Sequence, residues 1–366
     1  MESYRREYEF SLSSILSFVW RGVIVGCVSG SMVSLFRLLI AKIFAQVVQY
    51  YQLSHENPAL LGLILLVSVI VVIAIGFLVK SDPDIKGSGI PHVEGELKGL
   101  LHPDWWSVLW KKFIGGVLAI SMGFMLGREG PSIQLGAMAG KGVAKSLKAQ
   151  RMEQRVLIAS GAAAGLSAAF NAPIAGLLFV VEEIYHHFSR LVWISALVAS
   201  LVANFISLNI FGLTPVLAMP SDLVILPLHH YWMLLPLGAF LGIMGYLYEK
   251  VTLNANLFYD FLGKICHVPN YFYGIFVAIL ILPIGYFYPQ LLGGGNGLIT
   301  SLSTSHLTFA VVCLYFLIRF VWSTFSYASG LPGGIFLPIL TLGSLLGFGF
   351  GLGMHQIGFI STSVLC

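Results

Sequence analysis

The sequence predicts an all-α polytopic membrane protein, and three observations support this prediction. First, 57% of the 366 residues are hydrophobic and only 10% are charged, whereas a soluble domain carries about 25% charged residues to wet its surface. Second, Arg319 is the only Asp, Glu, Lys or Arg between Ile265 and Cys366. Third, the mean hydropathy is +0.87 and long apolar runs recur along the chain. Lipid is therefore the expected solvent for most of the protein.

The first expected elements are a short surface helix and a long span. Residues 1–12 contain Arg5 and Arg6 and are predicted to form an N-terminal surface segment. The apolar run from Phe10 to Tyr50 is too long for the core of a cleavable signal peptide. We therefore expect a long tilted membrane helix at this position.

Further apolar runs are predicted to be membrane spans. Leu60 to Val79 is a charge-free run of 20 residues, about the length that one helix needs to cross a bilayer core of ~30 Å. The other runs are Val108–Leu126, Val156–Val181, Leu191–Pro220, His230–Tyr248, Val268–Tyr288, Thr308–Tyr327 and Ile335–Phe350.

Several runs contain residues that are expected to break a helix. These interruptions are Gly115-Gly116, Asn171-Ala172-Pro173, Gly293-Gly294-Gly295 and Pro332-Gly333-Gly334. A break leaves backbone N–H and C=O groups unpaired, so it must be buried in protein or line a wet cavity. Glycines placed for close helix packing are the simpler explanation at any single position.

Charge and motif content limit the possible functions. The net charge of +4 is too small and dispersed to predict a nucleic-acid partner. No HExxH, GxSxG or dinucleotide-binding fingerprint occurs, so neither an enzyme nor a bound metal or cofactor is expected. The adjacent pairs His186-His187 and His229-His230 lack metal-ligand spacing and are expected at the membrane interface. Four cysteines are expected to be buried thiols: Cys27, Cys266, Cys313 and Cys366.

The basic residues predict the orientation. The densest cationic loop contains Lys141, Lys145, Lys148, Arg151 and Arg155. The positive-inside bias places this loop, together with the N-terminal segment, on the cytoplasmic side.

An internal repeat is the most informative pattern. Gly127 and Pro131 recur as Gly334 and Pro338 at an offset of 207 residues. The same offset relates Gly123 to Gly330, Leu135 to Leu342, Gly136 to Gly343 and Gly140 to Gly347. Upstream, Gly87-Ser88-Gly89-Ile90 resembles Gly295-Asn296-Gly297-Leu298 at an offset of 208. Two related halves with interrupted helices are typical of transporters whose site lies at the repeat interface.

The shared G-x-x-x-P pattern predicts a helix that begins inside the membrane. Glycine permits close backbone approach, and proline fits the first helical turn. The free N–H groups and positive dipole end of such a helix favour anions. Anion selectivity is therefore expected to come from the backbone.

Glu129 is the leading functional candidate because it lies beside such a helix start. A carboxylate in the membrane costs roughly 3 kcal/mol or more on insertion scales, which marks it as functional by default. We expect its oxygens to compete with the anion for N–H groups, so that protonation releases the site. The alternative is a carboxylate permanently neutralised by Arg128 or by the helix dipole.

Other polar residues in apolar sequence receive weaker predictions. Glu182 and Glu183 end an apolar run, and only one of two adjacent helical side chains is expected to face an interior path. Ser88 lies between two glycines, where its hydroxyl can donate to an anion or simply support a turn. Arg319 is expected to extend to an interface rather than contact a ligand.

Three motifs together resemble the anion-binding signatures of the CLC family of chloride channels and chloride/proton antiporters. They are Gly87-Ser88-Gly89-Ile90-Pro91, Gly127-Arg128-Glu129-Gly130-Pro131 and Gly334-Ile335-Phe336-Leu337-Pro338. Asn171-Ala172-Pro173 and the run to Glu183 also resemble the family's helix that leads to its internal glutamate. The resemblance implies a CLC-type inverted-repeat bundle of tilted and broken helices, and a homodimer with one anion path in each subunit.

The resemblance also implies roles for individual residues. Ser88 would coordinate the central anion, Glu129 would be the gating and proton glutamate, and Glu183 would be the internal proton-transfer glutamate. Backbone N–H groups of Ile335 and Phe336 would complete the site. The implied anion-binding set is Ser88, Gly89, Ile90, Arg128, Glu129, Gly130, Ile335 and Phe336. A serine at position 88 resembles the chloride-preferring members more than the nitrate-preferring or fluoride-specific ones.

The expected organisation is a single transmembrane domain, residues 1–366. The first repeat is expected at about residues 13–212 and the second at about 228–366. An offset of 207 places the counterparts of Asn171 to Glu183 beyond Cys366, so the second repeat is predicted to be incomplete. It would lack part of the dimer interface and a tyrosine that closes the family's site from inside.

The predicted function is chloride/proton antiport, with chloride, protons and the lipid bilayer as partners. A bacterial-type cell membrane with a cytoplasmic N-terminus is the expected location. The alternatives are a passive voltage-gated-type chloride channel and an inactive remnant.

Overall fold

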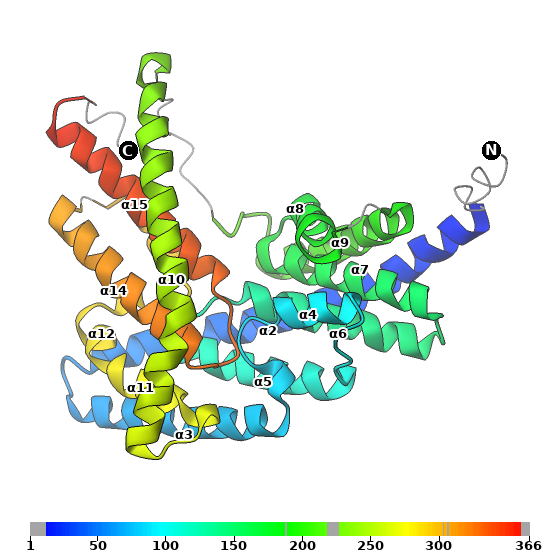
Figure 1. Ribbon diagram of the computed structural model, residues 1–366, viewed down its shortest axis with the longest axis horizontal. Helices are drawn as coiled ribbons and strands as arrows, with labels where there is room; N and C mark the ends of the chain where they lie inside the picture. Colours follow the sequence, from blue (N-terminus) through cyan, green and yellow to red (C-terminus); the bar gives the residue numbers. More distant parts are fainter. Residues whose placement is uncertain (1–11, 187–188, 218–226, 303, 306, 360–366) are drawn as a thin grey trace. The chain divides into compact units, whose positions relative to one another are not determined.

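The computed structural model describes residues 12–186, 189–217, 227–302, 304–305 and 307–359 (Figure 1). Several predictions concern residues outside these ranges, namely Arg5, Arg6 and the rest of the N-terminal segment up to residue 11, His187 and Cys366. The regular elements of the described residues are helices, and seven of these helices are long and apolar enough to cross a membrane.

The α-helices fall into two groups along the chain. The first half of the chain contains α2 (Leu12–Leu53), α3 (Ala59–Ser81), α4 (Ile90–Leu97), α5 (Trp105–Ser121), α6 (Glu129–Ser146), α7 (Arg151–Phe170), α8 (Pro173–Phe179) and α9 (Arg190–Phe211). The second half contains α10 (Leu234–Cys266), α11 (Gly274–Leu280), α12 (Leu282–Phe287), α13 (Asn296–Leu302), α14 (Phe309–Ala328) and α15 (Phe336–Gln356).

The predicted breaks have mixed outcomes. The break at Asn171 is confirmed, because α7 ends there in a left-handed residue and Pro173 begins α8. The breaks before α13 and before α15 are also confirmed. The break at Gly115-Gly116 is wrong, because both glycines lie inside α5. A helix tolerates glycine at a cost of about 1 kcal/mol, so glycine alone does not end one.

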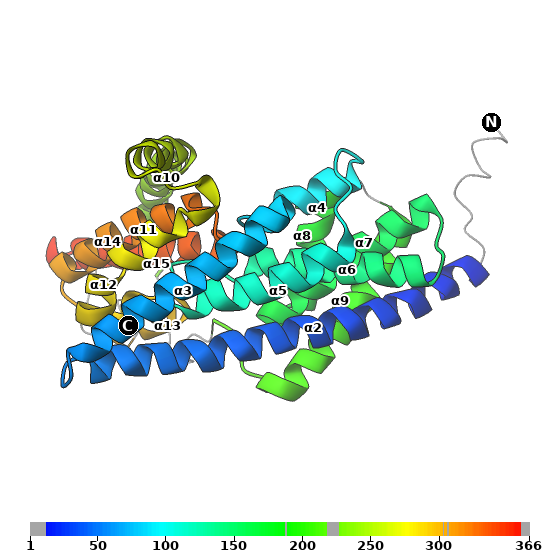
Figure 2. The same cartoon turned by 90° about the horizontal axis from the view of Figure 1, so that it is seen from below.

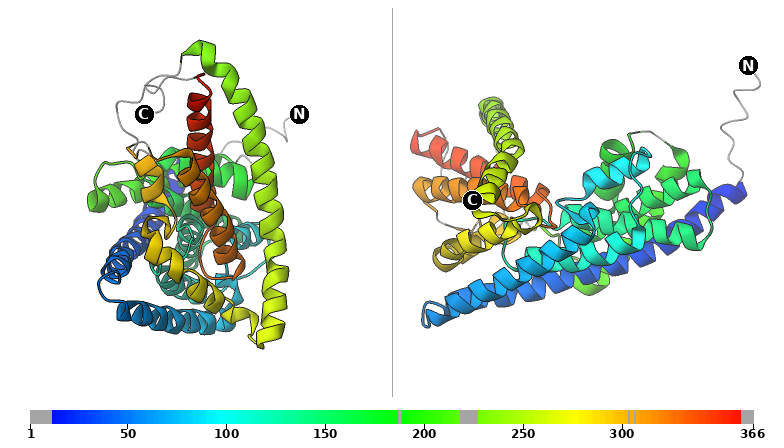
Figure 3. Two further views of the ribbon diagram at one scale, coloured as in Figure 1. Left: turned by 90° about the vertical axis from the view of Figure 1, so that its left-hand side faces the viewer. Right: turned by 60° about the horizontal axis from the view of Figure 1, so that its bottom comes forward.

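Two compact units make up the chain. Unit 1 comprises residues 1–39, 88–114 and 129–215, and unit 2 comprises residues 40–87, 115–128 and 216–366. In unit 1, α6 lies beside α7, and α7 also packs on α9 (Figure 2). In unit 2, α14 packs on α10 and α15, and α11 packs on α3 (Figure 3).

The backbone reproduces the sequence repeat around the two G-x-x-x-P motifs. α5 ends at Ser121 and α14 ends at Ala328, and the offset between these ends is again 207 residues. α6 begins at Glu129 and α15 begins at Phe336, with the same offset. Gly123 and Gly330, which occupy equivalent positions, both have positive φ angles, of 88° and 77°. Each helix start places the motif proline at its third residue.

Gly127 and Gly334 pair with each other inside unit 2. The N–H of Gly127 donates to the Gly334 carbonyl oxygen at 2.7 Å, and the N–H of Gly334 donates to the Gly127 oxygen at 2.6 Å. The two glycines occupy the same position in their repeats. Each donates one hydrogen bond to the other and accepts one from it, as a two-fold relation between the repeats requires.

The upstream alignment at an offset of 208 is wrong by two residues. Gly87 and Gly89 have positive φ angles just before α4, and Gly293 and Gly295 have positive φ angles just before α13. Gly87 and Gly293 are 206 residues apart, and so are Gly89 and Gly295. The starts of α4, at Ile90, and of α13, at Asn296, are separated by the same 206 residues. The glycine-rich run before α13 matches the first motif in more than one register, so letters alone did not identify the correct one.

The core of unit 1 is the α6–α7 pair. Every residue from Glu129 to Ala144 and from Val156 to Ala169 is buried. A Cβ atom on Gly136 would overlap the carbonyl oxygen of Gly161, and a Cβ on Gly161 would overlap that of Gly136. The helices therefore touch backbone to backbone, which is the packing that small residues permit in membranes.

Two predictions about polar and sulfur side chains are corrected. Arg319 does not extend to an interface: it is fully buried in unit 2 and donates to the carbonyl oxygens of Leu291, Gly293 and Gly294 at 2.8, 2.8 and 2.6 Å. Hydropathy locates a charge within a helix but does not tell which face it occupies. The thiols of Cys27 and Cys266 are exposed and that of Cys313 is partly exposed, so they are not buried.

Candidate anion-binding site

The first predicted motif forms the loop that enters α4. Gly87 and Gly89 adopt φ angles of 63° and 88°, a left-handed conformation that glycine takes without steric cost. Ser88 lies between them and is 7% exposed. Gly89 caps α4, whose second residue is Pro91. The loop therefore presents a buried hydroxyl next to the N–H groups of the first turn of α4, which have no acceptor within the helix.

The second motif meets this loop inside unit 1. Glu129 is the first residue of α6 and is 1% exposed. A Cβ atom on the next residue, Gly130, would lie 2.7 Å from the Ser88 carbonyl oxygen and 3.0 Å from its Cβ. Only glycine allows this approach. The structure thus brings Ser88, Glu129 and Gly130 together, with a carboxylate at the positive end of the α6 dipole.

The third motif lies in unit 2. Ile335 caps α15 and is partly buried, and Phe336 is the first helical residue, with 40% of its surface exposed. Arg128 also belongs to unit 2 and is partly exposed. It lines a cavity of about 540 Å³ together with the glycine-rich loop from Gly293 to Gly297. The buried guanidinium of Arg319 donates hydrogen bonds to the carbonyl oxygens of Gly293 and Gly294 in the same loop.

Glu182 and Glu183 lie on a π-helical turn, Val180–Tyr185, that continues α8. Sequence reasoning predicted an ordinary helix here, but π-helical turns are rare and frequently mark functional sites. Both glutamates are exposed. Exposure therefore does not distinguish the glutamate that faces an interior path from its neighbour.

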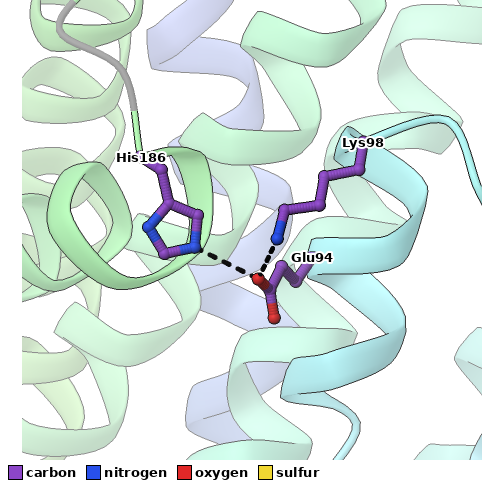
Figure 4. Close-up of polar contacts among 3 residues, drawn as sticks. All are labelled: Glu94, Lys98 and His186. Atoms are coloured by element: carbon purple, nitrogen blue, oxygen red, sulfur yellow. Dashed lines mark hydrogen bonds and ion pairs between the residues drawn. The ribbon is translucent and has the colours of Figure 1, made fainter.

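A three-residue cluster that the sequence did not reveal joins α4 to this turn (Figure 4). The Glu94 Oε1 atom accepts from Lys98 Nζ at 2.5 Å and lies 3.1 Å from His186 Nε2. The hydrogen bond from Lys98, and then that from His186, lowers the pKa of Glu94. The spacing of Glu94 and Lys98 is a recognisable i, i+4 pair. No local pattern predicts the contact with His186.

A second unpredicted ion pair anchors α4 to α6. Lys141 Nζ pairs with Glu96, and both side chains are buried. The same Nζ donates to the Pro103 carbonyl oxygen at 2.7 Å. Because a buried charge needs a partner, this pair fixes the position of α4 relative to α6 within unit 1. It thereby supports the contact between Ser88 and Gly130.

The arrangement suits an anion whose binding depends on protonation. Within unit 1, the starts of α4 and α6 offer N–H groups that lack intrahelical acceptors, and helix N-termini attract negative charge. Glu129 carries a carboxylate at one of these starts. Protonation removes its charge, and with it the repulsion of an anion nearby.

Comparisons with known proteins agree with these features. A family profile described as voltage gated chloride channel matches residues 70–365. The H(+)/Cl(-) exchange transporter ClcA of Vibrio parahaemolyticus is 34% identical, over 93% of this chain and 73% of that protein. The corresponding ClcA of Salmonella arizonae is 37% identical, over 75% of this chain and 58% of that protein.

Solved structures give the same result for the fold. The chain superimposes on a slow cyanobacterial Cl-/H+ antiporter with a TM-score of 0.86 and 30% identity, over 93% of this chain and 80% of that one. A CLC-type fluoride/proton antiporter has a TM-score of 0.75 at 20% identity, over 98% of this chain and 85% of that one, which shows a shared fold only. The chain therefore belongs to the voltage gated chloride channel (CLC) family and is an integral, multi-pass membrane protein.

Proposed function

We propose that this protein transports chloride across the membrane in exchange for protons. The observation that supports antiport is Glu129: a buried carboxylate at the first residue of α6, packed beside the Ser88 loop. Relatives that are more than 30% identical are named H(+)/Cl(-) exchange transporters.

The proposed mechanism uses one carboxylate as both gate and proton carrier. Ser88, the α4 start at Gly89 and Ile90, and the backbone N–H groups of Gly130, Ile335 and Phe336 bind chloride, and Arg128 adds positive charge. Ionised Glu129 competes with chloride for these donors. When Glu129 takes up a proton its charge disappears, chloride enters, and the proton later leaves toward Glu183. Each exchange thus links a proton to anion occupancy.

We further propose a homodimer in a bacterial-type cell membrane with a cytoplasmic N-terminus. The bacterial relatives support this location, and the cationic stretch from Lys145 to Arg155 around the α6–α7 connection supports this orientation. Lys141, which the sequence had placed in the same loop, lies inside α6 and is neutralised by Glu96, so it does not contribute. The chain is a single transmembrane domain, residues 1–366, built from the two repeats.

Proton movement driven by a chloride gradient in proteoliposomes tests the function. The wild-type protein is expected to move protons against chloride. Glu129→Gln and Glu183→Gln should abolish proton movement while chloride still moves, and Glu182→Gln is the matched control that should leave coupling intact. Unchanged coupling in both test variants would contradict the assignment. Chloride flux without proton movement in the wild-type protein would instead indicate a passive channel.

A further inference from the structure

Two arginines of α7 approach the connection between α4 and α5 in unit 1. Arg151 and Arg155 are four residues apart, so they lie on one face of the helix. A Cβ atom on Gly99, two residues after the end of α4, would lie 3.2 Å from Arg155 Nη2 and 4.0 Å from Arg151 Nη2. The two guanidinium groups therefore converge on the same point of this connection.

This convergence is electrostatically unfavourable for the protein alone. Like charges at i and i+4 destabilise a helix, and a cation in the first turn opposes the positive end of the helix dipole. Arg151 is the first residue of α7, and Arg155 follows one turn later. Among the described residues, neither arginine takes part in an ion pair. An anion placed at Gly99 would offset both unfavourable effects.

The other charged groups of these segments already have favourable surroundings. The carboxylates on α4 and in the first turn of α7 have basic partners, namely Lys98 and His186 for Glu94 (Figure 4), Lys141 for Glu96, and Arg21 for Glu153. Lys145 and Lys148 lie at and just beyond the C-terminal end of α6, where the helix dipole favours cations. The uncompensated charge of this surface therefore belongs to Arg151 and Arg155.

Exposed apolar side chains flank the two arginines along the chain. Leu100, directly after Gly99, is 76% exposed, and Met152, directly after Arg151, is 65% exposed. Trp106 at the start of α5 is 57% exposed, and tryptophan is enriched at the level of the lipid headgroups. A phospholipid offers a phosphate to the arginines and apolar chains to these residues, whereas free phosphate offers only the first.

We propose that Arg151 and Arg155 bind the phosphate group of an anionic phospholipid in the leaflet beside the α6–α7 connection. Each guanidinium can donate two parallel N–H bonds to phosphate oxygens. Gly99 keeps the space in front of them free of a side chain. Lys145 and Lys148 favour a lipid with a net negative charge over a zwitterionic one. The positive-inside bias accounts for basic residues in this connection, but not for the convergence of two of them on one glycine.

Lipid binding to the full chain tests the proposal. The chain is purified in detergent, and binding of phosphatidylglycerol and of phosphatidylcholine is titrated by native mass spectrometry. The wild-type chain is expected to bind phosphatidylglycerol about tenfold more tightly than phosphatidylcholine. Arg151→Gln combined with Arg155→Gln should weaken phosphatidylglycerol binding about tenfold, which corresponds to 1.4 kcal/mol. Lysine at both positions should give an intermediate affinity, because it keeps the charge but lacks the planar fork.

The matched control removes the same charge elsewhere. Lys250→Gln combined with Lys264→Gln changes two exposed side chains of α10 in unit 2; its affinity should stay within about twofold of wild type, because distant exposed charges are screened. Leu100→Gln combined with Met152→Gln should weaken phosphatidylglycerol binding, because these side chains contact the apolar part of the lipid. Arg155→Gln alone provides a second test if the double arginine variant loses the helical circular dichroism signal.

Three results would overturn the proposal. The first is equal affinity of the wild-type chain for the two lipids. The second is phosphatidylglycerol binding that loss of the arginines leaves unchanged. The third is displacement of the lipid by inorganic phosphate at millimolar concentration, which would make free phosphate the ligand. Binding is read without ion transport, so the result does not depend on the proposed antiport.

Discussion

Replacing Arg319 with methionine should strongly destabilise unit 2. The guanidinium is fully buried and donates to three backbone carbonyl oxygens in the connection from Leu291 to Gly294. The Gly294 oxygen also accepts from Thr341 Oγ1 at 3.1 Å, so it keeps one partner in the variant. The oxygens of Leu291 and Gly293 lose the guanidinium entirely.

The magnitude follows from those two oxygens. A buried polar group that loses its partner costs about 1–3 kcal/mol, so two such groups cost about 2–6 kcal/mol. Methionine also removes the cost of burying a charge, which offsets part of this loss. A net loss of about 2–4 kcal/mol is therefore expected, enough to lower the melting temperature by several degrees.

The assay is thermal unfolding in detergent, followed by tryptophan fluorescence. Arg319→Lys should fall between the wild type and Arg319→Met, because an ammonium group keeps the charge but lacks the planar fork that reaches several carbonyls. Arg190→Met is the matched control, since Arg190 is exposed at the start of α9. If Arg319→Met melts with the wild type, the buried guanidinium does not stabilise the loop and the reasoning fails.

Three further predictions concern other contacts. Gly130→Ala should weaken chloride binding by about tenfold in calorimetric titration, because the new methyl group displaces the Ser88 loop at an overpacking cost of about 1–3 kcal/mol; unchanged affinity would contradict the contact. Gly161→Val should abolish monodisperse expression, because α6 and α7 touch at backbone distance there; a stable, monodisperse variant would disprove that packing. The hydrogen bond from the Gln150 backbone, and then that from Arg21, lowers the pKa of Glu153, so its stabilisation is complete above the unfolded-state pKa and disappears as pH falls through the folded-state pKa. Glu153→Gln should thus flatten the fall in melting temperature under acid conditions, and an unchanged acid profile would exclude this role.

Much of the fold could be predicted because the membrane simplifies the relation between sequence and structure. Leu60 to Val79 became α3 with boundaries one or two residues wider, since an apolar run of that length has few alternatives in lipid. The G-x-x-x-P motifs located the starts of α6 and α15 for a local reason: glycine and proline each favour a helix start. These signals depend on a few neighbouring residues.

The wrong predictions share one physical cause: each depended on three-dimensional contacts that the neighbouring residues in the sequence do not determine. Arg319 was expected at an interface because hydropathy does not report which side of a helix faces protein. The run from Gly293 to Gly297 was aligned two residues out of register because identical letters fit more than one backbone. The contact between Glu94 and His186 joins residues 92 positions apart, so only tertiary structure reveals it.

The hydrogen bonds of Arg319 to backbone carbonyl oxygens have an electrostatic consequence. Carbonyl oxygens fill the hydrogen-bonding needs of a guanidinium but carry no net charge, and none of the ion pairs found among the described residues includes Arg319. A full positive charge thus remains inside unit 2, in a region of low dielectric. At an effective dielectric constant of about 20, such a charge attracts a monovalent anion about 10 Å away by roughly 1.7 kcal/mol. In the last third of the chain, which is nearly devoid of charged residues, the charge of Arg319 therefore favours anions over cations in its surroundings.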